Sequence, residues 1–505
     1  MARPREIELK LDIDVADAER LKTLPFLAKL PRRAPQHLRS VYYDTPEHAL
    51  AKHGMTLRVR TADGRYTQTV KTGGGTAAGL FDRSELEHEL DGPQPNLAKL
   101  KKAVLDELDH DMDVPQAVVP VFESDVERCS WTLQRGGAEI ELTLDQGVVR
   151  AGARSAPICE VEMELKRGSH RALFALARQC NAIVPLRLGV SSKSKRGYRL
   201  LDAREDAAEK AEPLVLNRAM DVGEGFQAIL RACLRHFRCN ESLVVQRRDV
   251  EGLHQVRVAM RRLRSALTLF RNVISDGSFG PIKSRLQLAS QQFGEARNLD
   301  VFLENIDQFP YIEGLAERAK AAREAAYDRV VETLASLAFR QLMLDLVAWM
   351  EFGPWRTSGE PVQKHSRQEK LTNFATDTLD SWRRKVKRKG AALDQIDEAE
   401  RHRVRIATKK LRYAAEFFAP LFPSRQAQRG RKAFVEALQE LQEALGTLND
   451  LVAGYDLIAR LAAMAPPSAD RVEAIPPVKR EPPPELLAAA AQAYANFLDA
   501  EPFWR

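Results

Sequence analysis

The most constraining feature of the chain lies near its N-terminus, where residues 6–10 read Glu-Ile-Glu-Leu-Lys. Successive side chains of a β-strand point to opposite faces, so this segment places Glu6, Glu8 and Lys10 on one face and two apolar side chains on the other. Two carboxylates and an ammonium group directed into one space suit a metal ion and an anion bound to it. The alternative is a half-buried edge strand whose polar face only meets water.

The same alternation recurs along the first third of the chain and favours a sheet with one charged and one apolar face. Closing such a sheet into a barrel gives a charged lumen, with the apolar side chains against covering helices. In that lumen, bases would hold phosphate oxygens and carboxylates would hold a hard cation such as Mg²⁺. The alternating sets are Arg58 and Arg60; Thr67, Thr69 and Lys71; Glu85, Glu87 and Glu89; Glu139, Glu141, Thr143 and Asp145; and Glu160, Glu162, Glu164 and Lys166.

Several short motifs, in the same order along the chain, resemble those of a CYTH domain, a triphosphate tunnel metalloenzyme. The resemblance covers residues 1–202, followed by a linker at 203–217. It implies an eight-stranded antiparallel β-tunnel that binds a linear triphosphate together with a divalent metal. The motifs are Glu6-x-Glu8-x-Lys10, Tyr42-Tyr43-Asp44-Thr45-Pro46, Leu57-Arg58-Val59-Arg60, Val70-Lys71, Arg128-Cys129-Ser130-Trp131, the run Glu160–Lys166 and the closing Ser192-Lys193-Ser194-Lys195-Arg196-Gly197-Tyr198.

By motif position, the resemblance also implies roles for individual residues. The catalytic set is Glu6, Glu8, Lys10 and Lys71. The implied metal ligands are Glu6, Glu8, Glu160, Glu162 and Glu164. The implied substrate ligands are Lys10, Arg39, Arg58, Arg60, Lys71, Arg128, Lys193 and Arg196, of which Arg39 matches least clearly. Three further acids, Glu85, Glu87 and Asp145, could bind a second metal or orient a water, or could be plain surface groups.

The implied reaction is hydrolysis of inorganic triphosphate to pyrophosphate and phosphate, assisted by Mg²⁺ or Mn²⁺. The alternatives are an ATP or thiamine triphosphatase, a class IV-type adenylyl cyclase, and a polyphosphate-binding scaffold without turnover. The alternating residues include no cluster of aromatics, which favours a substrate without a base. The intact set of Glu6, Glu8 and Lys10 argues against a scaffold that has lost its activity. No P-loop motif is present.

A repeat marks the second half of the chain. Residues 254–264 read His-Gln-Val-Arg-Val-Ala-Met-Arg-Arg-Leu-Arg, and residues 402–412 read His-Arg-Val-Arg-Ile-Ala-Thr-Lys-Lys-Leu-Arg. At helical spacing each segment forms one basic stripe. Like charges one turn apart destabilise a helix, so a stripe without acids indicates an anionic ligand, the alternative being an ordinary basic surface. The stripes are His254, Arg257, Arg261 and Arg264, and His402, Arg405, Lys409 and Arg412, with Arg262 and Lys410 beside them.

This half resembles a CHAD domain over residues 218–500, with repeats at about 218–351 and 369–463, then a proline-rich arm and a C-terminal helix. The resemblance implies an all-α domain of two pseudo-symmetric four-helix bundles, so that the whole chain is an α+β multidomain protein. The implied ligand is inorganic polyphosphate, held by both stripes. The histidines could donate hydrogen bonds to phosphate or could be structural.

Two further segments of this half carry expectations. The glycine-containing segments 294–300 and 446–450 are expected to end and restart helices. The basic run 383–389 belongs either to the same polyanion surface or to a solvated helix end.

Composition agrees with a polyanion-binding protein. The 505 residues carry a formal net charge of +7, which favours a polyanionic partner; because the two resemblances imply inorganic phosphates, we do not expect nucleic acid to be that partner. The chain has no long uncharged apolar stretch and no apolar signal core at its start, so we expect a cytoplasmic protein without a membrane partner. Five cysteines without a C-x-x-C pair read as reduced packing residues, not a zinc site. The sequence does not indicate an oligomeric state.

Overall fold

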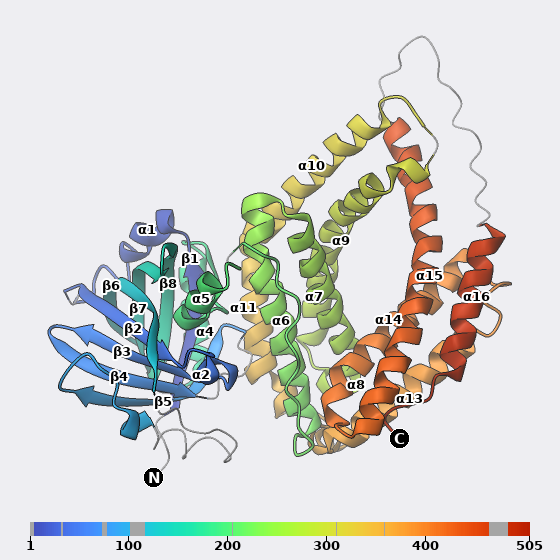
Figure 1. The fold of residues 1–505 in the computed structure, drawn as a ribbon. Coiled ribbons are helices and arrows are strands. Elements are labelled where there is room, and N and C mark those ends of the chain that lie inside the picture. Colours follow the sequence, from blue (N-terminus) through green and yellow to red (C-terminus); the bar gives the residue numbers. More distant parts are fainter. Residues whose placement is uncertain are drawn as a thin grey trace. The chain divides into compact units, whose positions relative to one another are not determined.

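The computed structural model describes residues 5–31, 34–72, 78–100, 117–204, 206–309, 311–357, 359–463 and 483–505, without the side chains of Arg5, Glu6, Arg83 and Ser84. The chain divides into two compact units (Figure 1). The first comprises Met1–Ala211, Leu234–Val256 and Thr333–Gly353, and the second Glu212–Cys233, Arg257–Glu332 and Pro354–Arg505. Two helical stretches from the second half of the chain therefore belong to the same unit as the N-terminal sheet.

One antiparallel sheet forms the centre of the first unit. Its strand order is β5-β4-β3-β2-β6-β7-β8-β1-β9, and β1 also pairs with β5, so β1 to β8 close on themselves. The predicted eight-stranded tunnel is confirmed, with a short ninth strand added on β1. The strands are β1 (Arg5–Ile13), β2 (Gln36–Asp44), β3 (Thr56–Ala62), β4 (Arg65–Thr72), β5 (Leu80–Leu90), β6 (Val119–Arg135), β7 (Ala138–Ala151), β8 (Arg154–Arg167) and β9 (Leu186–Leu188).

The register of β7, β8 and β1 aligns the charged residues that alternate along each strand. Lys10 of β1 lies opposite Glu162 of β8, and Asp145 of β7 lies opposite Glu160 of β8. Their side chains face the lumen, while the intervening apolar side chains are buried on the other face. Each buried apolar side chain contributes roughly 1.5–3 kcal/mol to folding, which fixes the face that every charge must take. The buried set includes Leu9, Leu11, Leu142, Leu144, Val161 and Met163.

Helix α5 (Lys193–Leu201) brings two more cations to the strands. The helix begins after Ser192, whose side chain accepts a hydrogen bond from the Lys195 amide at 3.1 Å. It packs against β6, β7 and β8. Gly197 permits this approach, because a Cβ there would lie 2.2 Å from the ring of Phe122. The other short elements of the sheet region are η1 (Val15–Asp17), α1 (Ala18–Lys22), α2 (Ala49–Lys52) and α4 (His170–Asn181).

Helices from the second half of the chain complete the first unit. The C-terminal part of α6 (Val222–Arg247), the start of α7 (Val250–Leu269), the end of α10 (Leu315–Ala335) and all of α11 (Leu337–Phe352) fall within it. Arg178 of α4 pairs with Asp345 of α11 at 2.9 Å. Helix α11 is therefore held against α4 by charge as well as by packing.

The regular elements described in the second unit are all helices, apart from one isolated β-bridge between Asp221 and Lys370, which confirms the predicted all-α second half. Within it, α13 packs on α14, α14 on α15 and α15 on α16. The expected C-terminal helix is α16, where the Tyr494 hydroxyl donates to the Lys387 carbonyl at 2.6 Å. Besides parts of α6, α7 and α10, the unit contains α8 (Arg271–Ile274), α9 (Phe279–Glu304), η2 (Ile306–Gln308), η3 (Pro354–Arg356), α12 (Pro361–Gln368), α13 (Leu371–Lys389), α14 (Glu398–Phe418), η4 (Ala419–Leu421), α15 (Arg425–Ala463) and α16 (Pro484–Asp499).

One expectation about this unit was wrong. Segments 294–300 and 446–450 do not interrupt helices but lie inside α9 and α15. A glycine inside a helix costs about 1 kcal/mol relative to alanine, and packing along such long helices readily offsets that cost. The arrangement as two pseudo-symmetric four-helix bundles stays a prediction, and the proline-rich arm lies outside the described residues. Of the helices described, none is both long and apolar enough to cross a membrane.

Candidate functional site

A cavity opens inside the tunnel of the first unit, with an empty volume of about 450 Å³ that includes space open to solvent. Side chains of both charge signs line it, together with hydroxyl groups. The charged residues come from four strands and α5, elements far apart in sequence that the closed sheet brings together. The lining residues are Glu8, Lys10, Tyr42, Thr56, Arg58, Thr69, Lys71, Glu162, Ser192, Lys193 and Ser194.

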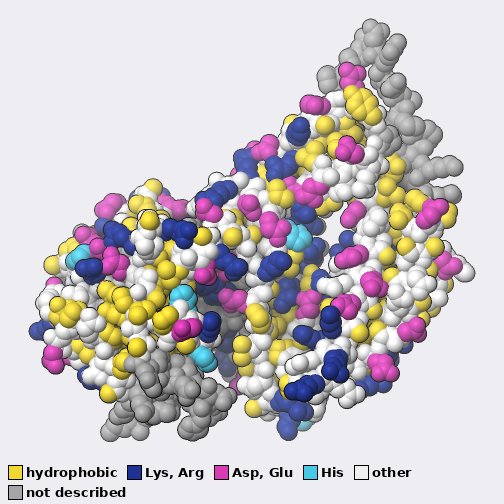
Figure 2. Space-filling view, viewed as in Figure 1, with side chains coloured by type: hydrophobic (Ala, Val, Ile, Leu, Met, Phe, Trp, Pro, Cys, Tyr) yellow, Lys and Arg dark blue, Asp and Glu magenta, His cyan; other side chains and the backbone are white. Residues whose placement is uncertain are grey.

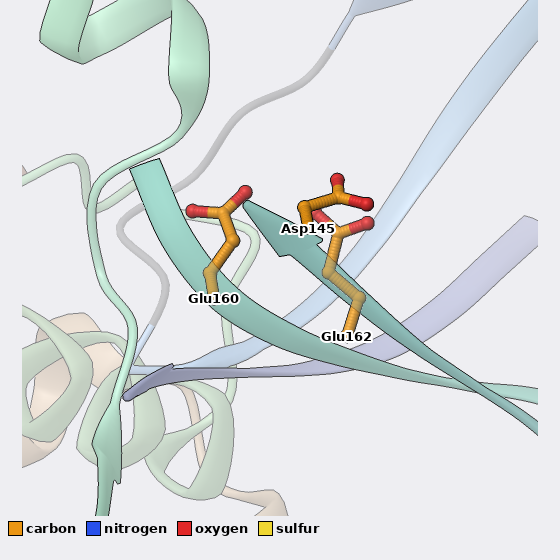
Figure 3. A group of neighbouring side chains, drawn as sticks. All are labelled: Asp145, Glu160 and Glu162. Atoms are coloured by element: carbon orange, nitrogen blue, oxygen red, sulfur yellow. The ribbon is translucent and has the colours of Figure 1, made fainter. Parts of the chain in front are cut away.

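Three carboxylates form a compact cluster on one wall of the tunnel. One oxygen from each of Asp145, Glu160 and Glu162 lies within 4.8 Å of the others (Figure 3). Asp145 comes from β7 and the two glutamates from β8, so the cluster follows from the strand register. Burial alone would raise the pKa of each carboxyl group, but the neighbouring cations outweigh burial and hold all three pKa values below their usual range. The cluster is therefore ionised at neutral pH.

Four basic residues pair with this cluster: Lys193, Lys10, Arg128 and Arg196, of which Arg196 lies 3.2 Å from Glu160. The Lys193 Nζ lies 2.7 Å from an oxygen of Asp145, 2.5 Å from Glu160 and 3.2 Å from Glu162. The Lys10 Nζ lies 2.9 Å from Glu160 and 3.1 Å from Glu162. Arg128 donates through two nitrogens to Asp145, each at 2.6 Å, and reaches Glu162 at 2.8 Å. Burial would lower the pKa of Lys10, but Glu160 and Glu162 outweigh it and raise that pKa.

The carboxylate cluster also fits a hard divalent cation. Both oxygens of Glu160 lie within ion-pair distance of cations, yet neither accepts a hydrogen bond from a described residue. The buried hydroxyl oxygen of Thr143, whose residue lies opposite Glu162 in the register, likewise has no partner in the described part of the chain. Carboxylate and hydroxyl oxygens of this kind are the ligands that Mg²⁺ and Mn²⁺ take.

The opposite wall, on β3, β4 and β5, carries a second mixed set of charges. Glu85 pairs with Lys71 at 3.0 Å and with Arg58 at 3.3 Å. The Nε atoms of Arg58 and Arg60 are buried, and the described residues supply no hydrogen-bond acceptor for either. Arg58 and burial together lower the pKa of Arg60 to about 10. Donors without acceptors and crowded positive charge favour an anion at this wall.

The structure brings together most of the residues that the sequence indicates for the tunnel. Glu8, Lys10, Arg58, Lys71, Glu162 and Lys193 line the cavity, and Glu160, Arg60, Arg128 and Arg196 lie beside its charged walls. Asp145, which the sequence left between a metal and a surface role, belongs to the acidic cluster. The signal that could have assigned it is the alternation along 139–145, which places Asp145 opposite Glu160 in the sheet.

Two predicted tunnel residues, Arg39 and Glu164, belong neither to the cavity lining nor to the acidic cluster. Arg39 has the wrong strand parity: it lies on the outer face of β2, exposed, where it pairs with Glu123 at 2.7 Å. Glu164 lies further along β8 and is paired with Lys166 at 2.6 Å. The side chain of Glu6 lies outside the described residues, so its role stays a prediction.

A second basic cluster lies in the helical unit, where the two repeats meet. Arg257 and Arg261 of α7 act electrostatically on Arg405 and Lys409 of α14. Figure 2 shows Lys and Arg side chains gathered over α7. The pKa of Arg257 is lowered to about 9, first by burial and then by Arg261 and Arg297. Arg297, on α9, was not among the basic residues predicted from the sequence. These four residues, Arg257, Arg261, Arg405 and Lys409, are called the seam cluster below.

The two glycine-containing segments, 294–300 and 446–450, each contact an arginine of the seam cluster. Arg257 donates to the Gly294 carbonyl at 2.7 Å, and Arg405 lies 3.8 Å from an oxygen of Asp450. Each arginine thus contacts its glycine-containing helical segment. The Nε atoms of Arg261 and Arg405 are buried without an acceptor among the residues described. Burial, followed by Arg405 and Arg261, lowers the pKa of Lys409 to about 7.

The other predicted basic residues of the helical half have different surroundings. Arg262 and Arg412 both bind Glu416, each at 2.7 Å, and so cross-link α7 and α14. Lys410 lies with its Nζ 5.2 Å from the ring centre of Trp382, and burial followed by Lys385, Lys283 and Arg264 lowers its pKa.

The two histidines and the basic run 383–389 have surroundings unlike those of the seam cluster. His402 contacts Asn449 at 3.1 Å, and His254 lies on the part of α7 that belongs to the first unit. In the run 383–389, Arg383 donates to the Ala500 carbonyl at 3.0 Å.

Comparison with known proteins finds two domain families, one after the other along the chain. Residues 4–198 match the CYTH domain family and residues 228–459 the CHAD domain family. A curated relative from Haemophilus influenzae, named inorganic triphosphatase, is 35% identical over 200 residues; the match covers 39% of this chain and 55% of the relative, so the chain spans only about half of that relative's length.

Two solved structures are also similar. The crystal structure of the CHAD domain from the plant Ricinus communis is 30% identical, covering 58% of this chain and 93% of that chain, with a TM-score of 0.45. A Hippeastrum protein described as an adenylyl cyclase with a dominant triphosphatase activity is 18% identical, covering 39% of this chain and 96% of that chain, with a TM-score of 0.29.

Proposed function

The chain carries a CYTH domain followed by a CHAD domain, and on that premise we propose that its tunnel hydrolyses inorganic triphosphate to pyrophosphate and phosphate while its helical half binds polyphosphate. The observation that carries the proposal is the composition of the tunnel cavity. Lys10, Arg58, Lys71 and Lys193 line it together with Glu8 and Glu162. A short polyanion with its counter-cation needs both kinds of group at close range.

The bases bind and orient the substrate. Arg58 and Lys71 on one wall face Lys10 and Lys193 on the other, so phosphate groups between them meet cations on both sides. The unused Nε donors of Arg58 and Arg60 would find acceptors in the bridging or terminal oxygens. Such positioning supplies most of the rate enhancement in phosphoryl transfer, because little covalent chemistry falls to the protein.

The reaction is an attack of water on a terminal phosphorus of the triphosphate. The bond from that phosphorus to its bridging oxygen breaks, pyrophosphate leaves with the electron pair, and the proton lost by water passes to solvent. A divalent cation, when bound to the acidic cluster of Asp145, Glu160 and Glu162 with Glu8 beside it, would offset the negative charge that builds on the phosphate oxygens. Because the pKa values of the cluster carboxyls are lowered, these groups orient water rather than keep its proton.

The cavity lining favours a substrate without a nucleobase. Tyr42 is the one aromatic residue among those that line the described cavity. Its ring stacks on Phe122 with the ring centres 4.6 Å apart, so one of its faces is already occupied. ATP or thiamine triphosphate would gain little binding energy here beyond the phosphate contacts that inorganic triphosphate also makes.

The seam cluster supports polyphosphate binding by the helical half. Its cations lie close together, two of its buried Nε atoms have no acceptor among the described residues, and burial followed by like-charged neighbours lowers the pKa values of Arg257 and Lys409. A polyanion would relieve that repulsion along its whole length. Mn²⁺ or Mg²⁺ is not required for this contact, since the protein already supplies the positive charge.

The experiment that tests the proposal measures phosphate release from inorganic triphosphate, ATP, thiamine triphosphate and long-chain polyphosphate, each with Mg²⁺, Mn²⁺ or EDTA. We expect metal-dependent release from inorganic triphosphate above all. Formation of cyclic AMP from ATP, without phosphate release, would replace the proposal by a cyclase. Binding of triphosphate with no turnover under any condition would leave only a scaffold.

A further inference from the structure

A chain of charged contacts runs from helix α6 to the acidic cluster of the tunnel, entirely within the first unit. It passes from Arg238 of α6 to Asp12 of β1, then to Arg196 of α5, and ends on Glu160 of β8. Arg238 lies within the range that matches the CHAD family at residues 228–459, whereas the other three residues lie in the CYTH range. A residue of the helical half is therefore three ion pairs away from the acidic cluster.

Arg238 is fixed on both sides. Its side chain is only 7% exposed, and it donates through Nε to the Leu188 carbonyl of β9 at 2.7 Å. A second nitrogen pairs with Glu241, one turn further along α6, and a third reaches Asp12 at 3.3 Å. Three acceptors in three directions use the fork of a guanidinium group, which an ammonium group could not reproduce.

Asp12 joins two arginines through its two oxygens. Oδ1 lies 2.9 Å from Arg196, and Oδ2 lies 3.3 Å from Arg238. Space for this carboxylate is made by Gly189, where a Cβ would lie 3.3 Å from Oδ1 and 2.6 Å from the Lys10 Cγ. Because both oxygens are used, the orientation of the Asp12 carboxylate depends on Arg238 as well as on Arg196.

Arg196 connects Asp12 to Glu160 of the acidic cluster. Its guanidinium lies 3.2 Å from the Glu160 oxygen that Lys10 and Lys193 do not contact. If Asp12 were free to turn, Arg196 could follow it away from Glu160 and from any phosphate bound nearby. Arg196 also donates to the Pro157 carbonyl at 3.4 Å, so its geometry depends on Asp12 together with that backbone contact.

We propose that Arg238 is a positioning residue for the triphosphate site, which acts through Asp12 on Arg196 and makes tunnel function depend on the first helix of the helical half. The inference rests on the proposed triphosphate-binding function. It assigns the helical half a role in the chemistry of the tunnel, beyond that of a separate polyphosphate-binding module.

The test compares Arg238→Ala with Arg235→Ala. Arg235 lies on the same helix and donates to the Val190 carbonyl at 3.0 Å, so its loss also removes a contact between α6 and the tunnel backbone, but not the link to Asp12. Two quantities are measured in the full chain: kcat and KM for inorganic triphosphate with Mg²⁺, and the affinity for triphosphate in EDTA by calorimetry. We expect Arg238→Ala to raise KM and weaken the metal-free affinity about fivefold, and Arg235→Ala to change neither.

Two further variants keep the test decisive. Arg238→Lys retains the charge beside Glu241, so it should fold even if Arg238→Ala does not, and it should still weaken triphosphate binding because the fork is lost. In combination with Asp12→Asn, Arg238→Ala should add no further loss, since both break the same chain of contacts.

Equal losses in Arg238→Ala and Arg235→Ala, or additive losses with Asp12→Asn, would overturn the inference while leaving the proposed function in place. A wild-type chain that neither binds nor hydrolyses triphosphate would instead overturn the proposed function, and the inference with it.

Discussion

The tunnel and the seam cluster both concentrate basic side chains, but they treat the charge in opposite ways. In the tunnel, Lys193 lies within 3.2 Å of three carboxylates, and these raise its pKa although burial alone would lower it. In the seam cluster, Lys409 has arginines for neighbours, and burial with their repulsion lowers its pKa to about 7. One site is neutralised from within and the other is left with excess positive charge.

This difference separates two ways of binding phosphate. A neutralised site stays folded without its ligand and can hold a short anion and a cation in one geometry, which hydrolysis requires. A site with excess positive charge does not require one particular register of the ligand. It binds most tightly a long polyanion that contacts all of its cations. The tunnel therefore suits turnover, and the seam cluster suits retention of a chain.

The largest expected effect comes from removing a tunnel carboxylate. Glu162→Gln keeps the shape of the side chain but weakens the acidic cluster, so we expect kcat for triphosphate to fall about 10³-fold. Phosphate release with saturating Mg²⁺ measures it. Glu123→Gln, on the outer face of the sheet where Glu123 pairs with Arg39, is the matched control and should retain activity. Normal turnover in Glu162→Gln would remove the cluster from the reaction.

The next prediction concerns stability, where the two regions should respond with opposite signs. Lys193→Met leaves three buried carboxylates short of a cation and should destabilise the first unit by about 3 kcal/mol. Lys409→Met relieves repulsion among arginines and should stabilise the second unit by about 1 kcal/mol. Hydrogen exchange of β8 and of α14 reports the two effects separately. If both substitutions changed stability in the same direction, the difference in charge between the two sites would not determine the stability of the units.

Polyphosphate binding should depend on where charge is removed, not only on how much. Replacing Arg257, Arg261, Arg405 and Lys409 together by alanine should weaken binding about 30-fold and flatten its dependence on salt. Four basic residues at the end of α13, Arg384, Lys387, Arg388 and Lys389, provide a control in which the same number of basic side chains is removed. Equal weakening by both variants would mean that the basic run shares the ligand.

The smallest effect is a dependence on pH. Lys409, with a pKa of about 7, is half protonated at neutral pH, and a bound polyanion would favour its charged form. Polyphosphate affinity should therefore fall severalfold as the pH rises above 7, and binding should take up protons in that range. In the free protein the sign is reversed: the unfolded chain holds this proton more tightly, so stability rises with pH between about 7 and the ordinary lysine pKa.

Calorimetry in buffers of different ionisation enthalpy counts the protons taken up. Lys409→Arg keeps its charge through this range and should abolish the uptake. Lys432→Arg, at an exposed position on α15, is the matched control and should leave it unchanged. Undiminished uptake in Lys409→Arg would assign the titration to another group.

Much of the tunnel could be predicted from sequence because each side chain of a β-strand faces either the lumen or the outer side of the sheet. Once Leu9 and Leu11 are buried, Glu8 and Lys10 must face the lumen. Arg39 shows the limit of this reasoning: on β2 both faces contain buried residues, so hydrophobicity does not decide the parity, and Arg39 falls on the outer face.

The helical half was predictable as a pattern but not as contacts. The repeat indicated two stripes, yet Arg262 and Arg412 of those stripes are bound to Glu416. The Arg262–Glu416 pair joins residues 154 positions apart, and only the packing of α7 on α14 can reveal it. The prediction that segments 294–300 and 446–450 interrupt helices was wrong for a related reason. Nothing in the local sequence shows that a long helix continues through them.

The pairing of β1 with β5, β8 and β9 has a consequence for how the protein is made. During synthesis β1 leaves the ribosome long before β8, and at roughly 5–20 residues per second the delay is on the order of ten seconds. Through that interval the strand has an unpaired edge, which invites aggregation. Its charged side chains, Glu8, Lys10 and Asp12, discourage such pairing, so residues that later line the tunnel also protect the nascent chain before a tunnel exists.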